Sequence, residues 1–325
     1  MSVPAQWQKR YGAAAARLMS IEEVLTVRAA LALGPPADQQ PMWWLSNPPV
    51  LPGTARVGVL AGSFNPLTPA HTALMSSAAR ALRLSVRLWA LSRVTVDKER
   101  VERATLSDRA VQMRAYLASR RAPAGLLLLG AGLYADQAEA LRASLPDGAR
   151  LWLILGYDKI VQIFDPRYYA ARDAALRRLF AAAELAVAPR GAYHAADLAE
   201  LLALPENRPY APRVRLLPAR MDLVGASSTL ARALATQAAT GQALAGHVEP
   251  EGAALALATG AYGAPDVLPT GEVVDRYALR QALVRQLAAR PGEWRDVQLA
   301  ELLARAAAPT PAGMRLRAEL RHSAS

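Results

Sequence analysis

The sequence predicts an α/β protein with a parallel sheet covered by helices on both faces. Short apolar runs indicate buried strands, and three of them lie at 56–61, 86–91 and 151–156. Segments with apolar residues at helical spacing lie between them, at 71–84, 106–118 and 134–145. Because strands that alternate with helices of this length form βαβ units, we expect a Rossmann-like parallel sheet.

The pattern extends on both sides of this region. Residues 8–34 have helical spacing, as one helix or two, and the prolines after Gly34 end it. Residues 35–55, rich in Pro and Gly, predict an irregular link. Further strands are expected at 125–129, 184–189 and 214–217, and further helices at 174–182 and 229–240. From about residue 265 the chain is helical and Arg-rich, so both ends carry helical extensions.

The composition excludes several classes of protein. Apolar residues make up 53% of the 325 residues and charged residues 20%, as in a globular chain. No apolar run reaches the ~18 residues that span a bilayer, and the N-terminal residues lack the apolar stretch of a secretory signal. The absence of cysteine excludes disulfides and thiolate metal sites. We therefore expect a cytoplasmic protein that does not bind membranes.

The net charge of +11 comes almost entirely from arginine, because Lys9, Lys98 and Lys159 are the only lysines. A basic chain can bind nucleic acid or an anionic small molecule. The arginines are scattered along amphipathic stretches, and no basic run is interleaved with aromatic residues. A solvated surface is the simpler interpretation, so no nucleic-acid partner is expected. A homo-oligomer is compatible with the sequence.

One segment has a phosphate-binding pattern: Gly62-Ser63-Phe64-Asn65-Pro66-Leu67-Thr68-Pro69-Ala70-His71. It follows a buried strand, and a helix begins at its end. The N-terminus of a helix has unpaired N–H groups and a partial positive charge, which favour phosphate. Gly62 lets the backbone approach an anion, and an imidazole at His71 can donate to a phosphoryl oxygen. His71 alone would be better explained as an ordinary first residue of a helix; the ordered string favours phosphate binding.

A second segment has a similar design: Gly225-Ala226-Ser227-Ser228-Thr229-Leu230-Ala231-Arg232. The hydroxyl residues suit the cap of a helix. Ser228 and Arg232 are four residues apart, so they share one helix face. A hydroxyl beside exposed N–H groups, with a guanidinium one turn later, forms a clamp for a triphosphate. An ordinary cap with a surface arginine would explain the segment equally well if it stood alone.

Together the segments resemble the two signatures of the HxGH nucleotidyltransferase superfamily. The first is similar to G-[ST]-F-[DN]-P-x-[HT]-x-G-H, with Thr68 at the first histidine, as in the phosphopantetheine adenylyltransferase branch, and Ala70 at the glycine. The second is similar to ISSTxxR, with Ala226 in place of Ile. The resemblance covers about 55–264. It implies an N-terminal helical extension and linker (1–54), a catalytic domain (55–264) and a C-terminal helical extension (265–325).

Within that superfamily, Gly156-Tyr157-Asp158 is similar to the G-x-D of nicotinamide and nicotinate mononucleotide adenylyltransferases. The resemblance implies catalytic roles for His71, Thr68 and Arg232, with His71 and Thr68 at the α/β-phosphates. It implies that ATP is bound by Gly62, Ser63, Phe64, His71, Gly156, Asp158, Ser227, Ser228, Thr229 and Arg232. It implies that the mononucleotide is bound by Ser63, Phe64, Lys98, Arg109 and Tyr169, with the pyridine ring stacked on Tyr169.

The implied reaction transfers AMP from ATP to nicotinamide or nicotinate mononucleotide and releases pyrophosphate, with Mg²⁺ as the cofactor carried by the phosphates. The expected partners are these two small molecules. Other readings stay open: a phosphopantetheine adenylyltransferase or cytidylyltransferase, or a degenerate protein that binds nucleotides for regulation. The methyl group of Ala70 and the terminal extensions motivate the degenerate reading.

Overall fold

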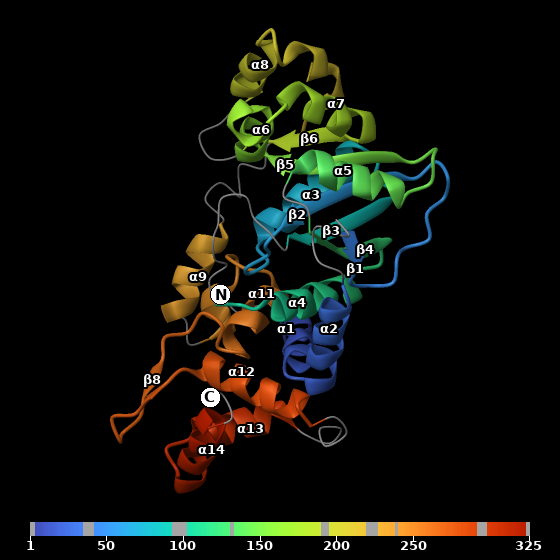
Figure 1. The fold of residues 1–325 in the computed structure, drawn as a ribbon. Coiled ribbons are helices and arrows are strands. Elements are labelled where there is room, and N and C mark those ends of the chain that lie inside the picture. Colours follow the sequence, from blue (N-terminus) through green and yellow to red (C-terminus); the bar gives the residue numbers. More distant parts are fainter. Residues whose placement is uncertain are drawn as a thin grey trace.

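The computed structural model describes residues 4–34, 42–92, 103–130, 133–189, 195–218, 227–237, 240–290 and 298–322. Its centre is a seven-stranded sheet in the order β1-β4-β3-β2-β5-β6-β7 (Figure 1). The strands are β1 Met42–Trp44, β2 Arg56–Gly62, β3 Val86–Ser92, β4 Ala124–Leu129, β5 Arg150–Gly156, β6 Glu184–Ala188 and β7 Val214–Leu216. All neighbours are parallel except β1, which runs antiparallel to β4. The predicted α/β class with a parallel sheet is confirmed.

The order of the strands reverses between β2 and β5. The chain passes from β2 outward through β3 and β4, and then returns to place β5 on the other side of β2. In such sheets, ligands bind outside the carboxyl ends of the strands at this reversal. β2 ends at Gly62 and β5 ends at Gly156. Two segments singled out from the sequence therefore lie at the same edge of the sheet.

Each face of the sheet is covered by its own set of helices. Val57 and Val59 belong to one apolar cluster and Leu60 to the other, because successive side chains of a strand point to opposite faces. One face packs against α3 (Pro69–Ala81), α4 (Leu106–Ala118) and α11 (Pro250–Leu257). The other packs against α5 (Tyr134–Ala143), α6 (Tyr157–Phe164), α7 (Arg172–Ala182) and α8 (Ala195–Ala203). The Rossmann-like architecture thus includes two helices, α6 and α8, that were not predicted from the sequence.

The N-terminal extension forms two helices, α1 (Ala5–Leu18) and α2 (Ile21–Leu33). Ser20 separates them and caps α2, since its side chain accepts from the backbone N–H of Glu23. α1 lies along α4 and α11, and Arg10 of α1 forms ion pairs with Glu249 and Glu251. The supposed irregular link contains β1, so the expectation of an irregular 35–55 was wrong for Met42–Trp44, a short edge strand paired with β4.

After the sheet the chain forms α9 (Ser228–Gln237), α10 (Gly241–Leu244), the short strands β8 (Asp266–Val267) and β9 (Val273–Val274), and then α12 (Arg276–Ala288), α13 (Leu299–Ala307) and α14 (Pro311–His322). Figure 1 shows α13 and α14 at the end farthest from the sheet, with α12 between them and α1 and α4. The expected C-terminal helices are present, with the β8–β9 hairpin before them. In the part of the chain that the structure describes, no helix is long and apolar enough to cross a bilayer.

Candidate active site

The loop after β2 is held by hydrogen bonds to its carbonyl oxygens. Five successive carbonyls each accept from a different group: Ser63 from Arg109 (2.8 Å), Phe64 from Gln112 (2.8 Å), Asn65 from Arg232 (2.9 Å), Pro66 from Ser228 (3.0 Å) and Leu67 from the N–H of Glu249 (3.1 Å). Carbonyl oxygens repel anions, so their engagement by protein donors removes a barrier to phosphate at this loop. The loop's shape is fixed from α4, α9 and α11 at once.

Phe64 has an unusual backbone conformation. Its φ is 44°, a left-handed value that residues other than glycine rarely adopt, and its side chain is completely buried. The ring contacts Trp89 and His71 edge-to-face, at centroid distances of 5.5 and 5.2 Å. A Cβ atom at Gly62 would lie 3.1 Å from this ring. Gly62 and Phe64 therefore fit each other, and such strain persists where the surroundings enforce it.

The ring of His71 has a defined orientation at the N-terminus of α3. Its Nδ1 accepts from the backbone N–H of Thr68 at 3.2 Å, and the hydroxyl of Thr68 lies 2.8 Å from the same atom. A backbone N–H can only donate, so Nδ1 of the neutral ring is the acceptor and the proton sits on Nε2. The side chain of Thr68 is fully buried. Thr68 thus lies where it orients His71.

The second motif reaches the loop from α9. The hydroxyl oxygen of Ser227 accepts from the N–H of Leu230 at 3.1 Å, so Ser227 caps the helix that begins at Ser228. Ser228 and Arg232 donate to the loop carbonyls named above, and Arg232 also donates to the hydroxyl of Thr229 at 3.3 Å. Arg232 and Asn65 are 167 positions apart in the chain. The fold brings together the two segments that the sequence predicts to bind phosphate.

Arg109 of α4 is a buried cation beside the loop. It is 4% exposed, one Nη donates to the carbonyl of Ser63, and its Nε has no hydrogen-bond partner among the described residues. No carboxylate in the described ranges forms an ion pair with it. Burial lowers the pKa of Arg109, while Tyr262, Tyr277 and Asp108 act in the opposite direction. A buried guanidinium without a direct counterion is suited to an anionic ligand.

Gly156 and Asp158 lie at the carboxyl end of β5, and Tyr169 follows α6. Gly156 precedes α6, and Asp158 is half-buried in the first turn of that helix. The hydroxyl of Tyr169 donates to the carbonyl of Ile163 at 2.8 Å, and its ring packs partly against the apolar cluster around α6 and α7. Burial raises the pKa of Tyr169 to about 12. Because β5 adjoins β2, Gly156, Asp158 and the loop share one edge of the sheet. Lys98 lies outside the described residues.

Three residues that hold the site were not singled out from the sequence. Gln112, completely buried on α4, donates to the carbonyl of Phe64 and accepts from the N–H of Leu67. Tyr262 donates to the side chain of Asn65. Glu249 accepts from the hydroxyl of Thr72 at 2.6 Å, one residue after His71. Gln112 offered a signal in the sequence, since it stands between Val111 and Met113 in a helix expected to be buried.

The comparisons with known proteins concern the fold. No protein-family model matches the sequence, and no curated protein matches it. Among solved structures, the chain is similar to the Plasmodium falciparum nicotinic acid mononucleotide adenylyltransferase complexed with NaAD (TM-score 0.46, 17% identity, 62% of this chain and 94% of that chain). It is also similar to the structure complexed with APC (TM-score 0.47, 15% identity, 64% of this chain and 97% of that chain). At such low identity and TM-score, neither similarity says anything about the activity of this chain.

Proposed function

We propose that the chain is an adenylyltransferase that joins AMP from ATP to nicotinamide or nicotinate mononucleotide. One observation carries the proposal: Ser228 and Arg232 of the second motif donate to the carbonyls of Pro66 and Asn65 in the first. The two segments, each of which suits phosphate by itself, therefore lie side by side and would form one site. A triphosphate lying between them would meet the N-termini of both α3 and α9.

In the proposed reaction, a phosphate oxygen of the mononucleotide attacks the α-phosphorus of ATP. The new O–P bond forms as the bond to the pyrophosphate oxygen breaks, in line, and no protein nucleophile is required. Positioning and neutralisation of charge supply the rate. His71 donates from Nε2 to a phosphoryl oxygen at the reacting phosphorus. Thr68 acts through His71, because its N–H and hydroxyl fix the ring.

The triphosphate is proposed to be held from α9. The Ser227 hydroxyl accepts a helix N–H and keeps its own proton to donate to a phosphate. The hydroxyl of Ser228 donates to Pro66, so Ser228 acts by fixing the loop. Arg232 is proposed to bind the β- and γ-phosphates with its guanidinium, which also donates to the carbonyl of Asn65. Thr229 is exposed beside it and contributes a further hydroxyl.

The mononucleotide is proposed to bind on the other side of the loop. Gly62 and Ser63 form its wall, with the buried ring of Phe64 behind them. Arg109, with Lys98, binds its phosphate. Tyr169 is proposed to stack on the pyridine ring, and a cationic ring on an aromatic face gains ~1 kcal/mol or more when water is excluded. The hydrogen bond from Tyr169 to Ile163 supports this role, because it holds the ring in place.

Mg²⁺ is proposed to accompany ATP. In the described ranges, no group of three or more His, Asp or Glu side chains is arranged to hold a metal ion. Mg²⁺ commonly binds through substrate phosphates and few protein ligands, so these residues fit a cation that arrives with the nucleotide. Asp158 is proposed to bind the ribose of the nucleotide or a water molecule on the cation. When bound, the cation would neutralise charge on the phosphates.

The activity is tested by pyrophosphate release from ATP with a panel of acceptors. We expect release with nicotinamide or nicotinate mononucleotide, and little with phosphopantetheine. Pyrophosphate release from CTP with a phosphorylated alcohol tests the alternative that the chain is a cytidylyltransferase. Release that occurs only with phosphopantetheine, or only from CTP, would assign the chain to another branch of the superfamily. Either result would contradict the proposed acceptor.

The second candidate is a protein that binds nucleotides without turning them over. Ala70 favours it, because its methyl group stands in the first turn of α3, next to His71, where the resembling motif has glycine. ATP binding without pyrophosphate release, for every acceptor in the panel, would support this candidate. In that case Ala70→Gly is expected to restore measurable turnover.

A further inference from the structure

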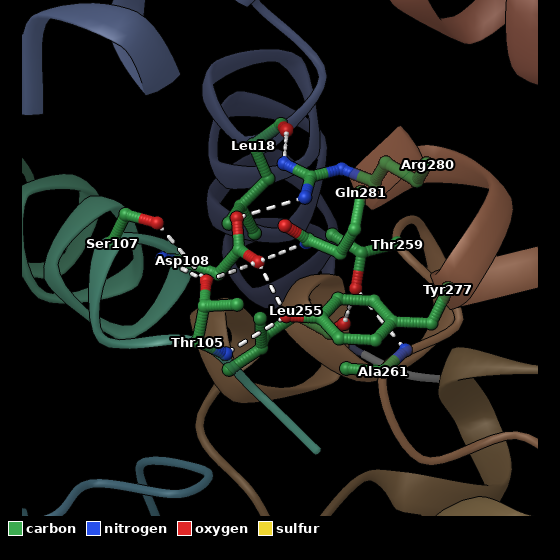
Figure 2. Close-up of polar contacts among 10 residues, drawn as sticks. All are labelled: Leu18, Thr105, Ser107, Asp108, Leu255, Thr259, Ala261, Tyr277, Arg280 and Gln281. Carbon is green, nitrogen blue, oxygen red and sulfur yellow. Dashed lines mark hydrogen bonds and ion pairs between the residues drawn. The ribbon is translucent and has the colours of Figure 1, made fainter. Parts of the chain in front are cut away.

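A buried polar cluster joins the C-terminal extension to the helix that carries Arg109. Figure 2 shows Asp108, the residue before Arg109 on α4, surrounded by side chains of α12. Asp108 is 1% exposed. Its Oδ1 accepts from Arg280 at 2.8 Å. Its Oδ2 accepts from Tyr277 at 2.5 Å, from Gln281 at 2.7 Å and from Thr105 at 2.8 Å.

Arg280 is completely buried and is held from two directions. One Nη donates to Asp108, and the other donates to the carbonyl of Leu18, the last residue of α1. The C-terminus of a helix carries partial negative charge, so it favours a cation there. Both terminal extensions therefore meet at Arg280, next to α4.

The carboxylate of Asp108 is neutralised by Arg280, so it does not neutralise Arg109. That carboxylate is paired with the buried guanidinium of Arg280, and Arg109, the next residue of α4, is a second buried guanidinium. Arg109 donates to the neutral carbonyl of Ser63. Asp108 is nevertheless close enough to act on Arg109, because it is one of the groups that raise its pKa against the larger effect of burial. One buried positive charge is thus left at the loop.

We propose that Arg280 neutralises Asp108 and so keeps the positive charge of Arg109 available to a phosphate bound at the Ser63 loop. This inference rests on the proposed function only in taking Arg109 as a ligand of a phosphate group. Arg280 is a positioning residue, since it acts through Asp108 and touches no substrate. It gives the C-terminal extension a part in anion binding, beyond packing.

The sign of the effect separates this role from a structural one. Arg280→Gln and Asp108→Asn break the same buried ion pair, and each leaves one charge without its partner, so both destabilise the fold. In Arg280→Gln the carboxylate of Asp108 keeps its charge without a partner, and this negative charge weakens anion binding at Arg109. In Asp108→Asn the guanidinium of Arg280 keeps its charge without a partner, and this positive charge does not weaken anion binding. A purely structural role predicts that both variants bind more weakly.

The experiment titrates inorganic phosphate, which stands in for the phosphate bound at the Ser63 loop, into the full-length protein by calorimetry. Circular dichroism shows that each variant is folded. For Arg280→Gln we expect Kd to rise by about fivefold or more, as for a buried charge left uncancelled. For Asp108→Asn we expect Kd to stay the same or fall. Weaker binding in both variants, or in neither, would overturn the inference.

A second pair of variants serves if the first pair does not fold. Gln281 is half-buried at the edge of the cluster and donates to Asp108. Gln281→Glu should raise the Kd for inorganic phosphate, and Gln281→Lys should lower it. Equal Kd values for these two would contradict the inference. Adding Arg109→Gln should abolish the difference between them, and a difference that persists would show that Arg109 is not the group affected.

The same titration distinguishes this inference from the proposed function. A wild-type protein that binds inorganic phosphate but releases no pyrophosphate from ATP would contradict the adenylyltransferase activity, while the comparison of variants would still decide the role of Arg280. A wild-type protein that releases pyrophosphate from ATP but does not bind inorganic phosphate would contradict this inference alone.

Discussion

Arg232 donates a hydrogen bond to the backbone carbonyl of Asn65 at 2.9 Å, across 167 positions of the sequence. The contact joins the start of α9 to the loop that precedes α3. It connects the two segments whose residue types suit phosphate. The relationship between the segments, more than either segment alone, supports a nucleotide site at the carboxyl edge of the sheet.

Arg232→Lys is expected to lower turnover strongly, because an ammonium cannot span the loop carbonyl and a phosphate as a planar guanidinium does. A loss of ~10²-fold in kcat, typical of a lost transition-state donor, is expected. Pyrophosphate release measures it. Gln237→Ala, an exposed change at the other end of the same helix, is the matched control. Equal activity of the lysine variant and the control would exclude the proposed clamp.

Gln112→Leu should destabilise the fold and weaken substrate binding. The buried amide serves both Phe64 and Leu67, and each buried backbone group left without a partner costs about 1–3 kcal/mol. The free energy of unfolding in urea and KM measure the two effects. Gln8→Leu, on the exposed side of α1, controls for the change of side chain. A Gln112→Leu protein as stable as the control would show that the loop does not depend on this amide.

Gly62→Ala tests whether the loop tolerates a methyl group. The added Cβ would lie 3.1 Å from the ring of Phe64, which in turn contacts His71, so we expect turnover to fall while the protein stays folded. Gly12→Ala is the control, because α1 offers open space there. It should raise stability by about 0.5–1 kcal/mol, as alanine does in place of a helical glycine. Unchanged turnover in Gly62→Ala would contradict the fit between Gly62 and Phe64.

Stability should fall at high pH. Burial raises the pKa of Tyr116 and Tyr169 to about 12, from 10.0. Between these values the native protein keeps phenolic protons that the unfolded chain has lost, so the free energy of unfolding decreases as pH rises above about 10 and is unaffected below it. Denaturant unfolding at several pH values measures the slope. Replacing both residues with Phe should reduce the slope. The remainder is due to the other tyrosines whose pKa values burial raises, which are Tyr11, Tyr134, Tyr262 and Tyr277. An unchanged slope would show that neither hydroxyl is buried.

The sequence predicted the sheet well because its central strands are short apolar runs buried on both faces, such as Leu151–Leu155, which have few other stable arrangements. It missed β1, because three residues in a Pro-rich stretch carry no periodicity. It missed α6, because that helix begins directly where β5 ends and its eight residues show little more than two turns of pattern. Single-sequence patterns are weakest for such short elements.

The site was predictable only in its local parts. Composition and spacing predicted a helix cap within Ser227–Thr229 and a helix start at His71. Ser227 is the cap, and His71 lies in the first turn of α3. The sequence did not reveal that Thr68 is buried against His71, nor that Gln112 and Tyr262 support the loop. These relations join residues from different elements, and they depend on tertiary packing that no local pattern encodes.

Pyrophosphate release from ATP and nicotinate or nicotinamide mononucleotide, compared between wild-type protein and His71→Ala, tests the central claim most directly. The Nε2 proton of His71 is the donor proposed for the reacting phosphate, and removing one such donor typically lowers kcat by ~10²-fold or more. We predict turnover by the wild type and a loss of this size in a folded His71→Ala protein. Equal turnover by the two proteins, or a wild type that releases no pyrophosphate with either acceptor, would contradict the account.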